Sequence, residues 1–161
     1  MGFFDKFTKN EIKIYSPMKG EIVAIENVPD ETFADKVMGD GVAVLPDDSI
    51  VRAPEAGTIS FVAETKHAFG ISTKSGLELL IHIGIDTVKL DGKGFELLVE
   101  EEQEVKAGDP IIKMDLEYLK ANAPSIISPV ICTELEDEDE LKIVAKGKVD
   151  FKDVLFTVVK K

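Results

Sequence analysis

The sequence predicts an all-β fold, an antiparallel β-sandwich or barrel with a few short helical turns. Two observations predict it. Short β-rich segments follow one another along the chain, and clusters of Gly, Pro and Asp separate them at intervals of about 8–15 residues. Helical periodicity is confined to short pieces.

The predicted strands start after the first turn-forming residues and continue to the end of the chain. In order they are residues 21–25, 41–45, 58–62, 77–83, 110–114, 128–133, 141–145 and 154–159, all rich in Val, Ile, Leu or Phe. Short helical segments are predicted at residues 30–37 and 116–123. The second ends before Pro124, because a residue that precedes proline is disfavoured in a helix.

A faint internal repeat indicates two related β-units. Residues 17–22 and 54–59 both read Pro-x-x-Gly-x-Ile, and residues 37–42 loosely resemble residues 105–111. In each copy we expect the glycine to adopt a positive φ in a tight turn that leads into a core strand. Chance in a glycine-rich β-protein is the alternative explanation.

The length of 161 residues fits one domain, which we expect at residues 11–161 after a flexible N-terminal segment, residues 1–10. In that segment Phe3, Phe4 and Phe7 have helical spacing and lysines nearby. A weak contact with a membrane surface is therefore an alternative to a frayed terminus. No apolar run reaches the roughly 18 residues that a membrane span needs.

The charge balance argues against nucleic acid as a partner. With 19 Lys and Arg against 31 Asp and Glu, the formal net charge is −12, which repels phosphate backbones and favours a partner with a basic patch. The single cysteine, Cys132, lies in an apolar run, so we expect a buried thiol rather than a reactive one. Without a disulfide, a cytoplasmic protein is the default expectation.

The two histidines, His67 and His82, both lie in strand-like segments. If residues 79–86 are extended, the side chains at 79, 81, 83 and 85 face the core, and those at 80, 82, 84 and 86 face the other way. Gly84 then leaves space beside the His82 ring for an approaching partner. Thr65 lies on the same side as His67, so its hydroxyl can bond one ring nitrogen and select the tautomer.

The spacing of the histidines allows two strands and a turn. A hairpin with its tip at Lys74-Ser75-Gly76 would bring antiparallel strands together and place the two rings in contact. A neutral imidazole is a nucleophile that can accept a phosphoryl group, and a second ring can donate an N–H to the phosphoryl oxygens. The pattern indicates phosphoryl transfer between proteins; two structural histidines are the alternative.

Several motifs together resemble one family. Glu64-Thr-Lys-His67-Ala-Phe69 and Leu80-Ile-His82-Ile-Gly-Ile-Asp86-Thr-Val88 are similar to the signature of the glucose-family enzyme IIA of the bacterial phosphoenolpyruvate-dependent sugar phosphotransferase system. Further similarity, at residues 16–22, 33–41, 90–95 and 105–109, runs in family order over nearly the whole chain from about residue 11. The resemblance implies a barrel-sandwich of the duplicated hybrid motif type, and a free-standing IIA protein rather than part of a fused transporter.

The resemblance also implies roles for four residues. His82 is expected to be phosphorylated at Nε2, and His67 to stabilise the phosphoryl group and support its onward transfer. Thr65 is expected to orient His67, and the carbonyl of Gly84 to hold the Nδ1–H of His82. The implied donor is the histidine-containing phosphocarrier protein and the implied acceptor is the cysteine of a glucose-type IIB domain. The transfer supports sugar uptake and requires no cofactor.

Partner docking is expected on an apolar ring around the histidines. By position in the family pattern, the ring comprises Phe33, Val37, Met38, Leu80 and Val88, with Asp30 and Asp86 as an acidic rim. Some family members bind zinc through the two histidines and a partner's carboxylate, so His67 and His82 are also candidate metal ligands. Two imidazoles supply only half of a tetrahedral site.

Two other functions stay open from the residues alone. A biotinyl or lipoyl carrier barrel shares Gly-Asp turns, and residues 17–20, with Lys19, faintly resemble a modified-lysine hairpin that lacks its second Met. A zinc hydrolase on a related β-scaffold would use His67, His82 and Asp86, but a clear further ligand pair and a general base are missing.

Overall fold

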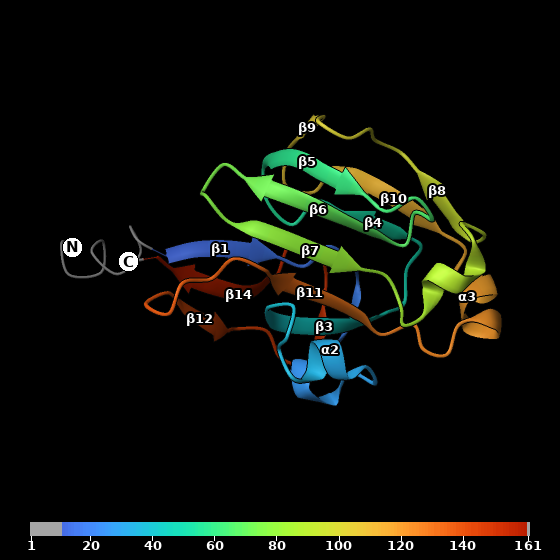
Figure 1. Ribbon diagram of the computed structural model, residues 1–161, viewed down its shortest axis with the longest axis horizontal. Coiled ribbons are helices and arrows are strands. Elements are labelled where there is room, and N and C mark those ends of the chain that lie inside the picture. The colour runs from blue at the N-terminus through green and yellow to red at the C-terminus, as the bar shows by residue number, and fades with distance from the viewer. Residues whose placement is uncertain (1–10, 161) are drawn as a thin grey trace.

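Strands predominate in the computed structural model, which describes residues 11–160 (Figure 1). The strands are β1 (Glu11–Tyr15), β2 (Gly20–Ala24), β3 (Asp40–Pro46), β4 (Ile50–Arg52), β5 (Gly57–Val62), β6 (Ala68–Thr73), β7 (Glu78–His82), β8 (Phe95–Leu97), β9 (Glu104–Val105), β10 (Pro110–Met114), β11 (Ser128–Cys132), β12 (Glu140–Ile143), β13 (Lys148–Val149) and β14 (Val154–Val159). The helical elements are α2 (Glu31–Ala34), α3 (Leu116–Asn122) and the 3₁₀ turns η1 (Ile25–Asn27) and η2 (Thr87–Leu90). The expected N-terminal segment, with its predicted flexibility and membrane contact, lies outside the described residues.

The predicted all-β, antiparallel class is confirmed. Eight strands form one sheet in the order β13-β2-β3-β11-β7-β6-β5-β9, and two three-stranded sheets have the orders β1-β14-β12 and β4-β10-β8. Side chains from all three sheets meet in one buried core, which includes Ile14, Ile71, Ile81, Ile112 and Phe156. Burial of such side chains is the main stabilising contribution, about 1.5–3 kcal/mol each.

Each predicted strand and helix corresponds to an observed element, and the expected hairpin is the β6-β7 pair. The sequence analysis did not predict β1, β4, β8, β9 and β13. Four of these are two or three residues long, too short to show alternation. Cys132 is buried in β11, and burial raises the pKa of its thiol to about 11, as expected for an unreactive thiol.

The structure contains the same arrangement of seven strands twice. One copy is continuous, β4 to β10, and the other combines β1–β3 with β11–β14 in the same order. In each copy a hairpin of the large sheet (β2-β3 or β5-β6) carries a two-residue strand on its outer edge (β13 or β9). In each, the central strand of a small sheet (β14 or β10) follows that short strand. The duplication indicated by the Pro-x-x-Gly-x-Ile repeat is therefore present in the fold.

The two copies of the repeat contact each other reciprocally. The backbone N–H of Tyr15 donates to the carbonyl of Pro54 (3.1 Å), and the N–H of Arg52 donates to the carbonyl of Pro17 (2.6 Å). Each donor lies two residues before the proline of its own copy. The repeated sequence pattern thus joins the two units at their centre.

The second predicted repeat, between residues 37–42 and 105–111, is wrong. The structural counterpart of residues 105–109 is residues 149–153, since both segments lead from the short edge strand into β10 or β14. In both turns an aspartate accepts the N–H three residues earlier: Asp109 from Lys106 (2.8 Å) and Asp153 from Asp150 (2.9 Å). The two segments share only their first residue, valine, and their last, aspartate, so the relation is hard to recognise in the sequence.

The glycines of the true repeat are needed for close backbone approach, not for a positive φ. A Cβ at Gly20 would lie 2.1 Å from the carbonyl oxygen of Leu45, and one at Gly57 would lie 2.2 Å from that of Ser72. Neither glycine has a positive φ. The expected turn conformation is therefore wrong for this pair, and the reason for glycine is the neighbouring strand.

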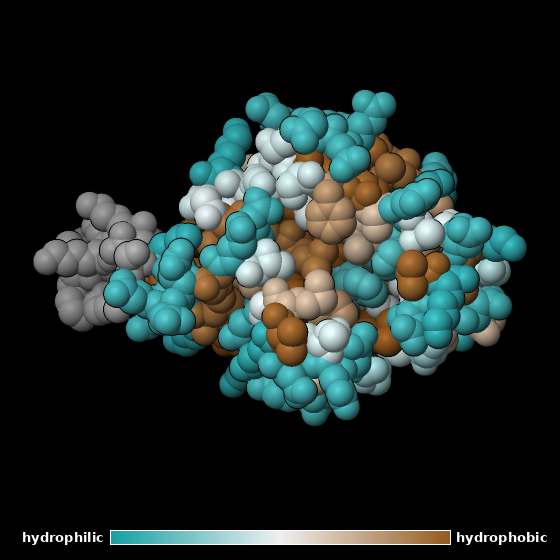
Figure 2. Space-filling view, in the orientation of Figure 1, coloured by the Kyte–Doolittle hydropathy of each residue, from teal (hydrophilic) through white to brown (hydrophobic). Residues whose placement is uncertain are grey.

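A second, smaller apolar cluster lies on the outer face of the large sheet, where η1 and α2 cover it. Its buried members are Ile25, Val28, Phe33, Ala43, Ala68, Leu80, Ile85 and Ile131. Figure 2 shows that apolar side chains gather over the middle of this face and that hydrophilic ones surround them. The two histidines lie beside this cluster.

Candidate functional site

The two histidines contact each other across the β6-β7 hairpin. His67 directly precedes β6, His82 ends β7, and Ala68 pairs with His82 in the ladder. The N–H of Ile83 donates to the carbonyl of His67 (2.7 Å), which extends the pairing past the end of the strand. The ring centroids are 4.9 Å apart with the planes at 77°, an edge-on contact. The predicted contact between the rings is confirmed, and both are partly exposed.

The predicted alternation holds only as far as Ile83. Ile81 and Ile83 are buried in the main core, but Ile85 packs in the outer cluster with Leu80. The expectation that Ile85 faces the main core is wrong because β7 ends at His82 and Gly84 turns the chain with φ of +72°. The turn matters for the site, since it brings a carbonyl back toward the His82 ring.

One nitrogen of the His82 ring is held by the backbone. The Nδ1–H of His82 donates to the carbonyl of Gly84 (2.7 Å). This bond selects the tautomer that has its lone pair on Nε2, and no hydrogen bond joins Nε2 to another residue of the described chain. The N–H of Gly84 donates to the Ser128 hydroxyl (3.1 Å), and a Cβ at Gly84 would lie 2.9 Å from the carbonyl oxygen of Ser125. The turn that orients the ring is therefore itself tightly held.

His67 is held from one side by Thr65. The Thr65 Oγ1 lies 2.6 Å from the His67 Nδ1, so the predicted contact of the hydroxyl with a ring nitrogen is present. If the hydroxyl donates, the proton of the neutral ring lies on Nε2, which then serves as a donor toward the space beside His82.

Burial keeps both rings neutral near pH 7. The pKa of His67 falls from 6.5 to about 4, because burial disfavours the imidazolium and because His82 lies beside it. The pKa of His82 is also lowered, mainly by burial. Its hydrogen bond to Gly84 and the carboxylates of Asp30 and Asp86 act in the opposite direction. A neutral His82 with a free Nε2 lone pair is a nucleophile.

Phe33 supports His82 from the α2 side. Their ring centroids are 5.1 Å apart with the planes tilted by 58°, and Phe33 is only 3% exposed. Asp30 caps α2 by accepting the N–H of Thr32 (3.0 Å), and its carboxylate also acts on His82. A helix of four residues is therefore fixed by its cap and by the burial of one aromatic ring.

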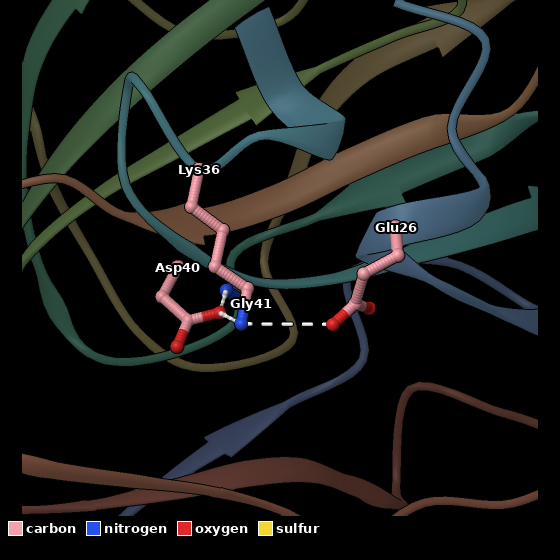
Figure 3. Close-up of polar contacts among 4 residues, drawn as sticks. All are labelled: Glu26, Lys36, Asp40 and Gly41. Carbon is pink, nitrogen blue, oxygen red and sulfur yellow. Dashed lines mark hydrogen bonds and ion pairs between the residues drawn. The ribbon is translucent and has the colours of Figure 1, made fainter. Parts of the chain in front are cut away.

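A lysine after α2 links this helix to its neighbours. The Lys36 Nζ lies 3.6 Å from the Glu26 Oε2 of η1 and 3.6 Å from the Asp40 Oδ1 of β3 (Figure 3). The same Asp40 oxygen accepts the N–H of Gly41 (2.8 Å). Exposed ion pairs of this kind contribute at most about 1 kcal/mol. They hold the covering segment in register over the outer cluster.

The structure divides the expected docking residues into two groups. Val37, Met38 and Val88 are exposed at 74%, 42% and 51%, and Asp30 and Asp86 lie close enough to act on the His82 pKa. Phe33 and Leu80, at 3% and 7%, are buried. The expectation that these two offer docking surface is corrected: Phe33, the buried side chain of α2, and Leu80 of β7 pack together in the outer cluster beneath the site.

The sequence analysis missed Phe61, an exposed apolar side chain on this face. Phe61 is 40% exposed, and a register shift between Ile59 and Phe61 sets its direction. A β-bulge leaves no periodic signal in a single sequence, so no residue pattern could have indicated it.

The two imidazoles are the metal-binding candidates of this face. In residues 11–160 no group of three His, Cys, Asp or Glu side chains has the geometry of a metal site. Two imidazoles supply only two of the four ligands of a tetrahedral zinc ion, so the described residues of this chain do not form a zinc site by themselves.

Comparison with known proteins assigns the geometry to a family. Residues 12–138 match the family described as phosphoenolpyruvate-dependent sugar phosphotransferase system, EIIA 1. The chain belongs to this family. Membership makes it a IIA component that takes part in phosphoryl relay for sugar uptake and carries phosphate on histidine.

Relatives of this IIA component include single proteins and parts of larger ones. The chain is 55% identical over 136 residues to the N-acetylglucosamine-specific EIICBA component of Klebsiella pneumoniae. These residues make up 84% of the chain and 21% of that protein. The chain thus spans about a fifth of that relative. It is 48% identical over 154 residues to the glucose-specific EIIA component of Staphylococcus epidermidis, covering 92% of the chain and 93% of that protein.

The fold of the IIA component is also that of a solved structure. Glucose permease IIA from Mycoplasma capricolum superposes with a TM-score of 0.86 at 44% identity, covering 91% of this chain and 95% of the other. The carrier-barrel and zinc-hydrolase alternatives receive no support from these matches. No helix among residues 11–160 combines the length and hydropathy that a membrane crossing requires.

Proposed function

We propose that this IIA component receives a phosphoryl group on Nε2 of His82 from the histidine-containing phosphocarrier protein and passes it to the cysteine of a glucose-type IIB domain. One observation carries the proposal. The hydrogen bond from Nδ1 of His82 to the Gly84 carbonyl (2.7 Å) leaves Nε2 as the nucleophile, beside a second histidine at 4.9 Å.

Both transfer steps take place at the Nε2 atom of His82. The Nε2 lone pair of His82 attacks phosphorus, and the bond from phosphorus to the donor's histidine nitrogen breaks. The phosphorylated ring keeps its Nδ1–H and is formally positive, and the Gly84 carbonyl stabilises that charge. In the second step a thiolate of the acceptor attacks phosphorus, the Nε2–P bond breaks, and His82 returns to its neutral form.

His67 acts on the phosphoryl oxygens. With the Thr65 hydroxyl donating to Nδ1, the Nε2–H of His67 is available to a phosphoryl group on His82. Because the pKa of His67 is lowered to about 4, this donor is a neutral imidazole. It stabilises developing charge without binding the phosphoryl group so tightly that onward transfer stops.

The partners of the proposal follow from the charge and the exposed ring. Val37, Met38 and Val88 supply apolar contact, and the acidic rim of Asp30 and Asp86 favours a partner with lysine or arginine. The transfer needs no bound cofactor, and zinc would require further ligands from a partner. As part of the proposal, the relay takes place in the cytoplasm.

Labelling tests the acceptor. Phosphoenolpyruvate, enzyme I and the phosphocarrier are incubated with the protein, and the modified residue is mapped by mass spectrometry. We expect one acid-labile, base-stable phosphoryl group on His82 and none on the His82→Ala variant. Full labelling of that variant would refute the assignment.

Onward transfer tests the second histidine. The His67→Gln variant is expected to accept the phosphoryl group but to pass it to a IIB domain roughly 100-fold more slowly, the usual cost of losing one donor to developing charge. Rapid quench with radiolabelled protein measures the rate. Onward transfer at the wild-type rate would remove His67 from the mechanism.

A further inference from the structure

We propose that Phe61 is an anchor for the phosphoryl-donating protein, a partner that presents an apolar side chain next to lysine or arginine. The inference rests on the proposed function and names a contact that the family resemblance did not indicate. It starts from a bulge. In β5, Ile59 pairs with Ile71 but Phe61 pairs with Gly70, so the register shifts within two residues. Ile59 is fully buried, and Phe61 is 40% exposed.

The Phe61 ring lies on the backbone of the neighbouring strand. A Cβ built at Gly70 would lie 2.6 Å from Cδ1 and 2.7 Å from Cε1 of Phe61, so the ring occupies the position that a side chain at 70 would take. Gly70 pairs with Leu80, and Ala68, two residues earlier, pairs with His82. Phe61 therefore lies on the same face of the sheet as His82.

Phe61 lies close enough to His82 for one protein interface to cover both residues. Two strand spacings of about 4.8 Å and two residues of about 3.4 Å along the strand give about 12 Å between them. A standard interface buries about 800 Å² on each partner, a disc with a radius of about 16 Å. An interface of this area that is centred on His82 covers Phe61.

A held carboxylate beside Phe61 supplies the charge. Glu78 lies on β7 on the same face as Leu80 and His82, and its Oε1 accepts the hydroxyl of Ser72. Its Oε2 lies 3.4 Å from the hydroxyl of Ser60, the residue at the bulge. Since the carboxylate is already oriented, a partner's lysine or arginine meets it at a low entropic cost. An exposed aromatic ring next to an anion is the arrangement that a basic, apolar surface complements.

Binding and kinetics of the Phe61→Ala variant test the proposal. The probe is the unphosphorylated histidine-containing phosphocarrier protein, and calorimetry gives its Kd. We expect Phe61→Ala to weaken binding about tenfold and to raise the KM for the phosphorylated carrier more than it lowers kcat. Leu98→Ala is the matched control, because Leu98 is also 40% exposed but follows β8, which belongs to the small sheet β4-β10-β8. Phe61→Leu is expected to restore most of the affinity.

The outcomes separate this proposal from the proposed function. If His82 is labelled but Phe61→Ala binds like the wild type, or Leu98→Ala weakens binding equally, the anchor is refuted and the relay stands. If the wild-type protein neither binds the phosphocarrier nor is labelled, both are refuted. A dimer of this chain in sedimentation analysis that Phe61→Ala dissociates would assign the ring to a second copy instead and overturn the proposal.

Discussion

At the scale of single residues, two short hydrogen bonds decide the chemistry of the site. The Gly84 carbonyl and the Thr65 hydroxyl each bind the Nδ1 of one histidine, which leaves both Nε2 atoms for the phosphoryl group. Neither bond depends on a charged residue. Burial, not a hydrogen bond, supplies the low pKa values that keep the rings neutral.

Histidine titration is the prediction at this scale. In the folded protein we expect both rings to titrate below the ordinary pKa of 6.5, with His67 near 4. As the pH falls from 6.5 toward 4, both histidines bind protons more readily in the unfolded chain than in the folded one. The free energy of unfolding therefore decreases. NMR titration of the ring protons gives the midpoints. A His67 midpoint at 6.5 or above would contradict the burial argument.

At the scale of elements, the β2-β3 and β5-β6 hairpins of the large sheet depend on glycines that face a backbone. Gly57 begins β5 and Gly20 begins β2, and the adjacent strand occupies the space of a Cβ at both positions. The backbone cannot move without separating a ladder of hydrogen bonds, since Gly57 pairs with Thr73 and Gly20 with Pro46. The duplicated fold thus requires a glycine at the equivalent position of both copies.

Alanine substitutions measure how much each glycine contributes to stability. We expect Gly57→Ala and Gly20→Ala each to lower the free energy of unfolding by about 1–3 kcal/mol, the range for overpacking a tight site. Urea unfolding followed by circular dichroism measures the loss. Gly76→Ala is the control, because its Cβ would meet no atom within 4 Å, although φ is +97°. Its cost arises from φ alone and should be smaller than that of either strand glycine. Equal losses at all three positions would refute a role for backbone contact.

At the scale of the whole molecule, charge determines how the site meets its partners. The formal net charge of the chain is −12, and on the face shown in Figure 2 hydrophilic side chains surround an apolar centre. A basic partner is attracted from a distance, and apolar contacts then stabilise the complex. The strongly acidic segment of residues 134–140 contributes to the field without forming a metal group among the described residues.

Salt dependence is the prediction at this scale. Raising the ionic strength from about 0.05 to about 0.5 M should lower the association rate constant with the phosphocarrier about tenfold, because screening shortens the range of the attraction. The dissociation rate constant should change less, since the anchors are apolar. Stopped-flow fluorescence measures both. An association rate that is constant or rises with salt would show that net charge has no part in the encounter.

Local patterns predicted most of the strands and the central pair of residues. Turn clusters marked the strand boundaries, and the spacing of His67 and His82 around a Lys-Ser-Gly tip predicted the hairpin that joins their rings. Alternation failed at Ile85, because a positive φ at Gly84 is invisible to a period-two pattern. The docking ring was only partly predictable, since exposure depends on tertiary packing, and Phe33 and Leu80 are buried in the outer cluster.

The sequence by itself determined the class of fold, the two histidines and the contact of Thr65 with His67, because each of these depends on neighbours in the chain or on a short hairpin. The role of the Gly84 carbonyl followed from the family resemblance. The tertiary structure alone decided the pairing of the two repeats, the burial that lowers the histidine pKa values and the direction of Phe61. Those properties arise from strands that are distant in sequence but adjacent in the sheet, and their contacts leave no periodic trace in the chain.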